Sequence, residues 1–435
     1  MKRFYLLVAV AACCLLGVKT SYATHNMGKD IQYICHGVVA GQMQYEVIIR
    51  YYRNCWDNQS GSAAVNAPSS VSLEVSATNC TGYTANYTAQ LDPNAVPPNG
   101  SEVSQLCASQ LPSSGCNWTQ AGNPPYPGVQ IYTYRRLVSV PLGCTNVTFG
   151  TTDCCRNGAI NNIPSPDSRD LSIKATANNT IDPLTGQPYC NNSVTFTNQP
   201  VPFFCLGSGV TFNHGAVDSD GDSLVYSLIN PLEGGSLPYT NIPFMANYNV
   251  STPIRTSPAN TFNFNTQTGQ MQFTPAFQEQ CVLAVRVDEY RNGILIGSTM
   301  RDIQVVILNC AIAIPAQEPI TNVQNGNQVD SLSVQVCPGT PLRFDILCTD
   351  PANHDLVLSS NLNTTPSAIP GATMTQVGTG DTVTARIEWT PLPGDTGCHN
   401  FVLTAENDDC PIKGTYTRVY SICVFTKVQL LSASI

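Results

Sequence analysis

The sequence predicts an all-β, disulfide-rich protein of several domains, the last two being tandem β-sandwiches. Short runs rich in β-branched and aromatic residues recur along the chain, separated by clusters of Gly, Pro, Asn and Ser. No long apolar pattern with the 3.6-residue helical period occurs. The chain also has 19 cysteines, 31 glycines and 31 prolines in 435 residues, a composition typical of a cross-linked β protein rich in turns.

The first 23 residues have the pattern of a secretory signal peptide. Lys2-Arg3 precedes an apolar run over residues 4–18, and Ser21-Tyr22-Ala23 fits a cleavage site between small residues. Residues 10–13 also resemble a lipoprotein cleavage box, a second interpretation that the continuing apolar run disfavours. No later apolar run is long enough to span a membrane. We therefore expect an exported protein.

Charge excludes some partners. Charged residues make up 11% of the chain, the net charge is −9, and only six lysines occur. Such a chain is poorly suited to bind nucleic acid or an anionic membrane surface.

Cysteine usage indicates a disulfide framework. Cys13 and Cys14 belong to the signal, which leaves 17 cysteines in a chain expected outside the cell. No C-x-x-C pair suggests zinc. Because 17 is odd, at least one thiol is free or pairs between chains.

Residues 24–199 form the predicted N-terminal β-rich domain. Its clearest strand lies at residues 44–52, and further strands are expected at 71–75, 129–140 and 146–149.

An internal repeat defines the second half of the chain. Residues 205–218 align without a gap to residues 337–350, so that Cys205 matches Cys337 and Asp218 matches Asp350. A period of this size is that of whole domains. We expect β-sandwich modules of immunoglobulin-like size at 200–310 and 331–427, a linker or edge strand at 311–330, and a tail at 428–435.

The repeat also suggests which cysteines pair. Cys205 and Cys281 correspond to Cys337 and Cys398, so we predict Cys205–Cys281 and Cys337–Cys398 bridges. Each of the three regions contains an odd number of cysteines. At least one bridge is therefore expected to cross a domain boundary.

The first module has about 16 extra residues, which we place in the loop at 231–258. Tyr239, Phe244 and Tyr248 in this loop are candidates for ligand contact, because long loops without a strand pattern often bind ligands. A decorated surface loop is an equally good interpretation.

Asp218, Asp220 and Asp222 alternate in a Gly-containing turn and could converge on a calcium ion, to which Asp288 and Glu289 could supply further oxygens. Of these two we include Asp288 in the candidate calcium site. The alternative is an acidic β-turn whose carboxylates accept hydrogen bonds from their own backbone. The second module replaces the middle of this turn, so we expect a calcium ion only in the first.

No catalytic pattern is present. The chain has no G-x-S-x-G, no H-E-x-x-H and no Gly-rich phosphate loop, and its five histidines are scattered. His214 lies near Cys205, but an oxidised cysteine is no nucleophile. We expect no enzymatic activity. Aromatic residues of the N-terminal region could form a glycan-stacking face, or alternation could place about half of them in the core; they are Tyr51, Tyr52, Trp56, Tyr132 and Tyr134.

Several blocks resemble one family. YYRNC at residues 51–55, CCRNGAINNI at 154–163 and DSDGDSLVYSLINPLEG at 218–234 are similar to the N-terminal part of large secreted surface proteins of Bacteroidota. VDEYRNGILIGSTMRDIQVVILNC at 287–310 is another such block. These proteins often carry a gliding-motility-associated C-terminal domain and use the type IX secretion system. The acidic turn with Thr274-Pro275 also resembles cadherin-like and immunoglobulin-like domains.

The resemblance implies an adhesive or structural role at the cell surface, with no catalytic residues to carry over. Longer relatives end in a sorting domain, so this chain is expected either to be part of a longer protein or to be held by another route. We therefore expect a non-catalytic surface protein whose partners are other surface proteins, glycans or copies of itself. Alternatives are a filament subunit joined by strand or thiol exchange, and a carbohydrate-binding module.

Overall fold

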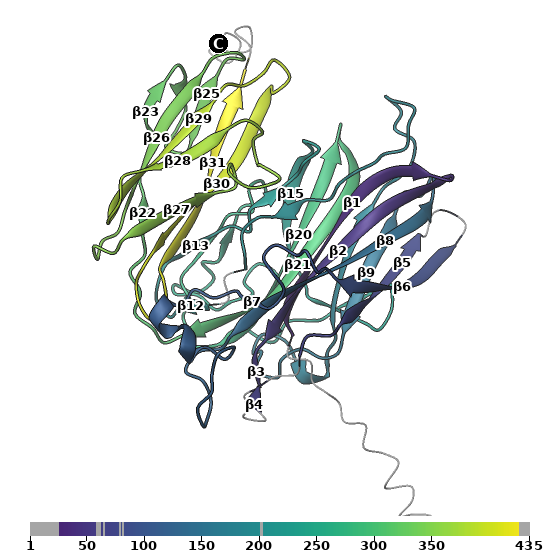
Figure 1. Ribbon diagram of the computed structural model, residues 1–435, viewed down its shortest axis with the longest axis horizontal. Helices are drawn as coiled ribbons and strands as arrows, with labels where there is room; N and C mark the ends of the chain where they lie inside the picture. The colour runs from purple at the N-terminus through teal and green to yellow at the C-terminus, as the bar shows by residue number, and fades with distance from the viewer. Residues whose placement is uncertain are drawn as a thin grey trace, which may run out of the picture.

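The computed structural model describes residues 26–57, 62–63, 66–77, 80, 82–200 and 203–425. Nearly all of its regular structure is β, as predicted (Figure 1). The described helices are two short 3-10 turns, η1 (Ala108–Ser113) and η2 (Pro166–Ser168). None of the described helices is long and apolar enough to cross a membrane. The predicted signal at 1–23 and tail at 428–435 lie outside the described residues.

Eight strands pair in a closed antiparallel ring, and the last strand returns to the first. In ring order they are β1 (Asn26–Val39), β2 (Gln42–Asn54), β8 (Val129–Pro141), β6 (Tyr83–Leu91), β5 (Ser70–Ala77), β9 (Val147–Asp153), β10 (Leu171–Ala177) and β21 (Ile294–Leu308). Alternate residues of β2 belong to one buried cluster, because successive side chains of a strand face opposite ways; they are Met43, Tyr45, Val47 and Ile49. The ring therefore encloses its own core.

Strand β21 connects the ring to the first module. Its residues 297–303 pair with β10 and β1, and its residues 306–308 pair with β12 (Phe203–Cys205). On its other side it pairs along most of its length with β20 (Gln280–Arg291). The sheet and a shared core thus continue across the predicted boundary at residue 199; that core contains Met27, Tyr52, Ile131, Phe204 and Phe273.

The two repeats have the same strand pairings. In the first, β12, β21, β20 and β15 (Ser223–Ile229) form one sheet, opposite β13 (Val210–Phe212), β19 (Met271–Phe273) and β18 (Asn263–Phe264). The second repeats this order. Its sheets are β25 (Ser333–Val336), β31 (Thr415–Val424), β30 (Gly397–Asn407) and β27 (Leu356–Ser360), opposite β26 (Leu342–Thr349), β29 (Thr382–Trp389) and β28 (Thr373–Val377).

Short strands complete these units. Within residues 311–330, β22 (Ala316–Gln317) and β23 (Thr321–Gln324) pair with β26, and β24 (Asn327–Gln328) pairs with β25. This segment therefore contributes edge strands to the second module. The remaining short strands are β3 (Trp56–Asp57), β4 (Ser62–Ala63), β7 (Ser101–Glu102), β11 (Thr195–Phe196), β14 (Ala216–Val217), β16 (Leu232–Glu233) and β17 (Thr240–Asn241).

The prediction of a Cys205–Cys281 bridge is wrong, because Cys205 bonds to Cys310. Strand β21 lies between the strands that carry Cys205 and Cys281. Two strand spacings amount to about 9.5 Å, beyond the roughly 7 Å between Cα atoms that a disulfide tolerates. Cys281 is a buried free thiol.

The Cys337–Cys398 prediction fails for the same reason. Strand β31 separates β25, which ends just before Cys337, from Cys398 of β30. Cys398 instead bonds to its direct cross-strand neighbour Cys423. Cys337 and Cys348 are free thiols.

The expected bridge across a domain boundary is present. Cys107, directly before η1, bonds to Cys410 of the second module, 303 residues away. Within the N-terminal region the bonded pairs are Cys35–Cys190, Cys55–Cys116, Cys80–Cys144 and Cys154–Cys155. The ring and the second module are thus joined by a covalent bond as well as by the chain.

Candidate functional site

The acidic turn at 218–222 links β14 to β15 and is organised around Asp218. The Oδ1 atom of Asp218 accepts the backbone N–H groups of Asp220 (2.9 Å) and Asp222 (2.8 Å). Gly221 between them has φ +83°, a conformation that glycine adopts without steric cost. The turn therefore has the self-capped geometry of the acidic β-turn alternative.

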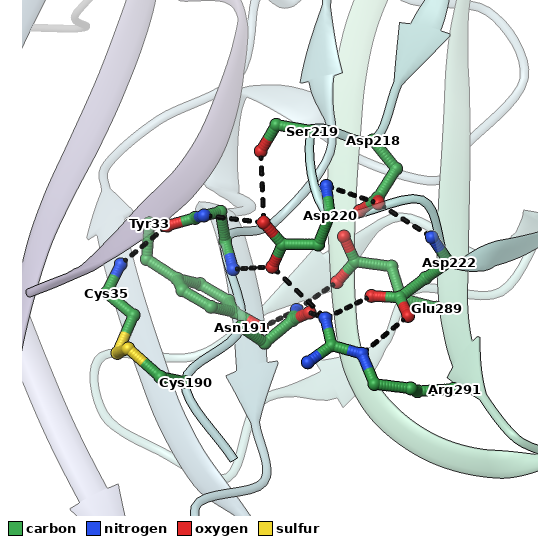
Figure 2. Close-up of polar contacts among 11 residues, drawn as sticks. Tyr33, Cys35, Cys190, Asn191, Asp218, Ser219, Asp220, Asp222, Glu289 and Arg291 are labelled. Atoms are coloured by element: carbon green, nitrogen blue, oxygen red, sulfur yellow. Dashed lines mark hydrogen bonds and ion pairs between the residues drawn. A yellow bond between two sulfur atoms is a disulfide. The ribbon is translucent and has the colours of Figure 1, made fainter. Parts of the chain in front are cut away.

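A guanidinium lies against this turn. Arg291, near the tip of the β20–β21 hairpin, donates from Nε (2.8 Å) and Nη2 (2.8 Å) to the two carboxylate oxygens of Asp222. Its Nη2 also lies 3.2 Å from Oδ2 of Asp220 (Figure 2). Arg291 thus supplies the positive charge that a cation would otherwise bring to these two carboxylates.

The same turn is tied to the N-terminal region. Asp220 accepts hydrogen bonds from the backbone N–H (2.9 Å) and side-chain Nδ2 (2.7 Å) of Asn192. The Oδ1 atom of Asn192 accepts the backbone N–H of Cys35 on β1 (2.9 Å), and Cys35 is bonded to Cys190. The site is therefore a junction at which the turn, the hairpin and β1 meet (Figure 2).

Asp288 does not belong to this junction, which corrects the sequence prediction. Its carboxylate accepts from Arg286 Nη2 at 2.8 Å, whereas the next residue, Glu289, accepts from Nδ2 of Asn191 at 3.0 Å. Successive residues of a strand face opposite sides. The strand register therefore directs Glu289, not Asp288, towards the turn.

Asp218 and Glu289 retain buried oxygen atoms without a hydrogen-bond partner among the described residues: Oδ2 of Asp218 and Oε1 of Glu289. Burial raises the pKa of Asp218 to about 6 and raises the pKa of Glu289 well above its usual range, with the charge of Asp218 adding to the second shift. A proton on one carboxyl would supply the missing donor for the other. Gly297 leaves room for the carboxylate of Glu289, since a Cβ at this position would lie 2.2 Å from Glu289 Oε2.

No group of three or more His, Cys, Asp or Glu residues in the described part of the chain is arranged to hold a metal ion. Calcium at Asp218, Asp220 and Asp222 stays a prediction, and it would have to displace Arg291.

The aromatic residues of the 231–258 loop pack inwards. Tyr239 is 8% exposed and lies in the core of the ring. Phe244 packs against a small buried cluster, and the hydroxyl of Tyr248 donates to Glu279 (2.6 Å). The loop contributes β16, which pairs with β10. Tyr239 thus attaches the loop to the ring, whereas Phe244 and Tyr248 are half-buried, and ligand contact by this loop stays a prediction.

The N-terminal aromatics are largely core residues, as the alternation argument anticipated. Tyr51 and Tyr134 belong to the core of the ring, and the hydroxyl of Tyr52 donates to Asp30 (2.7 Å). His214 lies 3.3 Å from Arg301 Nη1 and is buried, which lowers its pKa. Buried in this way, Tyr51, Tyr52 and Tyr134 are not available to stack on a glycan at the surface.

Comparison with protein-family models and with curated proteins finds no match. Among solved structures, the endo-fucoidan hydrolase MfFcnA4 of glycoside hydrolase family 107 is similar over 91% of this chain at 13% identity and a TM-score of 0.18. The chain spans 43% of that protein. The Dpr2 Ig1-Ig2 complex with DIP-Theta Ig1-Ig3 aligns over 91% of this chain and 99% of the other, at 9% identity and a TM-score of 0.18. Likenesses this weak carry no argument about activity.

Proposed function

We propose that this chain is a secreted, non-catalytic structural or adhesive protein of the cell surface. The observation that carries the proposal is that the three parts of the chain are joined by strand pairing and by a disulfide. Strand β21 is shared by the ring and the first module, and the Cys107–Cys410 bridge fixes the second module to the N-terminal region. Disulfides of this density suit an oxidising environment outside the cytoplasm. A stiff scaffold of this kind holds binding surfaces at fixed positions, which favours adhesion.

The experiment uses beads coated with oxidised protein of residues 24–435. They should be retained under flow on surfaces coated with cells or polysaccharides, and no new reducing ends should appear in the polysaccharide. Failure to retain the beads on any surface, or steady release of reducing ends, contradicts the proposal.

A filament subunit is the second candidate, and Cys337 favours it. Its equivalent in the first module, Cys205, is bonded to Cys310, whereas Cys337 is a half-buried free thiol directly after β25. A non-reducing gel of concentrated protein tests it. Polymers that disappear on reduction and in Cys337→Ser support thiol-linked assembly, and a monomer at every concentration contradicts it.

A further inference from the structure

A cavity of about 370 Å³ lies beside Trp56 of β3, where five parts of the chain meet. They are the start of β1 at Met27, the end of β2 with Trp56, the prolines of residues 124–127, the loop at 157–161, and the ends of β20 and β21 with the residues just before β20. The volume is within the roughly 300–1,000 Å³ of small-molecule sites.

Trp56 lines this cavity in a fixed orientation. Its indole Nε1 donates to Oδ1 of Asn123 at 3.2 Å, and the preceding Cys55 is bonded to Cys116. Gly115 permits the close approach, since a Cβ there would lie 2.9 Å from the Cβ of Trp56. The indole of Trp56 is therefore held in position before any ligand arrives, which reduces the entropy cost of binding.

Side-chain amides supply the polar part of the lining. Oδ1 of Asn157 accepts the backbone N–H of Ala159 (3.0 Å), and Oδ1 of Asn161 accepts the backbone N–H of Gln280 (2.8 Å). No hydrogen bond within the described residues engages the NH₂ groups of these two amides. Because their oxygens are held by the protein, Asn157 and Asn161 offer the cavity donors rather than acceptors.

The cavity lining has no charged group that is free to bind an ionic ligand. Among its described lining residues, no lysine or arginine occurs, and the sole carboxylate is Glu279. That carboxylate already accepts from Arg255 Nε (2.7 Å) and from the hydroxyl of Tyr248 (2.6 Å). A phosphate, a sulfate or a free cation would therefore find no opposite charge here.

We propose that this cavity binds a neutral saccharide, with a sugar ring against Trp56 and its hydroxyl oxygens accepting from the NH₂ groups of Asn157 and Asn161. A sugar combines an apolar C–H face with many neutral acceptor oxygens, which matches an aromatic wall beside uncharged donors. The inference deepens the proposed adhesive function, on which it rests, by naming the ligand class and its site.

The test uses Asn157→Asp/Asn161→Asp in the oxidised protein. Each aspartate keeps the oxygen that caps a backbone N–H and replaces the donor by an acceptor, so the fold should be retained. The matched control is Asn265→Asp, because Oδ1 of Asn265 likewise accepts backbone N–H groups, from Gln267 (2.8 Å) and Thr268 (3.1 Å), in a turn away from the cavity.

The probes are the neutral tetrasaccharides of glucose, mannose, galactose and xylose, titrated by calorimetry and by tryptophan emission. At least one should bind the wild-type protein and the control equally, and at least tenfold more weakly to the double variant. Binding of none of them, or equal binding to the double variant, overturns the saccharide site. Beads that are still retained on surfaces in that case would leave the adhesive function standing without this site.

Discussion

Arg156 and Asp302 form a buried ion pair in which the guanidinium donates to both carboxylate oxygens, at 3.0 Å from Nη1 to Oδ1 and 2.7 Å from Nη2 to Oδ2. Both side chains are 1% exposed. The preceding residue of β21, Arg301, pairs with Asp30 of β1 at 2.9 Å on the opposite face. Charges from the N-terminal region therefore hold the shared strand from both sides.

Removing one partner of this pair should destabilise the protein strongly. Arg156→Ala leaves Asp302 buried without its cation, and such losses cost about 3–5 kcal/mol. The free energy of unfolding in urea measures the change. The control is Lys413→Ala, which breaks a 2.7 Å pair with Glu406 between half-exposed side chains and should cost about 0–1 kcal/mol. Equal effects of the two changes would show that the buried pair does not hold β21.

The observed cysteine pairing predicts that substitutions of two cysteines of the first module lower stability by unequal amounts. Cys205→Ala opens a bridge that closes 105 residues and should lower stability by about 4 kcal/mol. Cys281→Ala removes only a buried thiol and should cost about 1 kcal/mol. Thermal unfolding in non-reducing buffer distinguishes them. A loss of stability for Cys281→Ala as large as that for Cys205→Ala would instead support the Cys205–Cys281 bridge predicted from the sequence.

The Asp218 and Glu289 carboxyls predict a loss of stability as pH rises. Their folded pKa values are raised, so the folded state retains protons that the unfolded state has released. The contribution of Asp218 is full below pH about 4 and is lost as the pH rises to about 6, a change of about 3 kcal/mol. Loss of the Glu289 contribution continues to higher pH.

Glu289→Gln isolates this effect, because a glutamine keeps an acceptor for Asn191 and can donate to Asp218. We expect the variant to be more stable than the wild type at pH 8, with a flatter melting curve against pH from 4 to 8. Parallel curves for the two proteins would mean that this carboxyl pair does not govern the pH dependence.

Removal of Arg291 should make the acidic turn responsive to calcium. Arg291→Ala leaves Asp220 and Asp222 without their guanidinium, so the melting temperature should fall. Millimolar calcium should raise it again in the variant and have little effect on the wild type, because Arg291 occupies the ion's place. An equal calcium shift in both proteins would show that ion and guanidinium do not compete.

Local patterns in the sequence were sufficient for the fold class and for the four strands predicted in the N-terminal region, which correspond to β2, β5, β8 and β9, because β-branched runs and turn clusters depend on neighbouring residues. The wrong disulfides came from treating equivalent cysteines as partners: alignment gave the positions of Cys205 and Cys281 but not the strand between them. Both Asp288 and Glu289 are possible oxygen donors from the sequence, because a single-residue register decides which of two successive side chains faces the turn. Pairing of β1 with β21, some 270 residues apart, leaves no local signal.

We propose that the ring, the first module and the second module form one cross-linked scaffold outside the cytoplasm. Non-reducing peptide mapping by mass spectrometry, on protein collected from the cell surface, tests it most directly. The account predicts linked peptides for Cys107–Cys410 and Cys205–Cys310, with Cys281, Cys337 and Cys348 alkylated as free thiols. Alkylated Cys107 and Cys410, or a linked Cys205–Cys281 peptide, would contradict it.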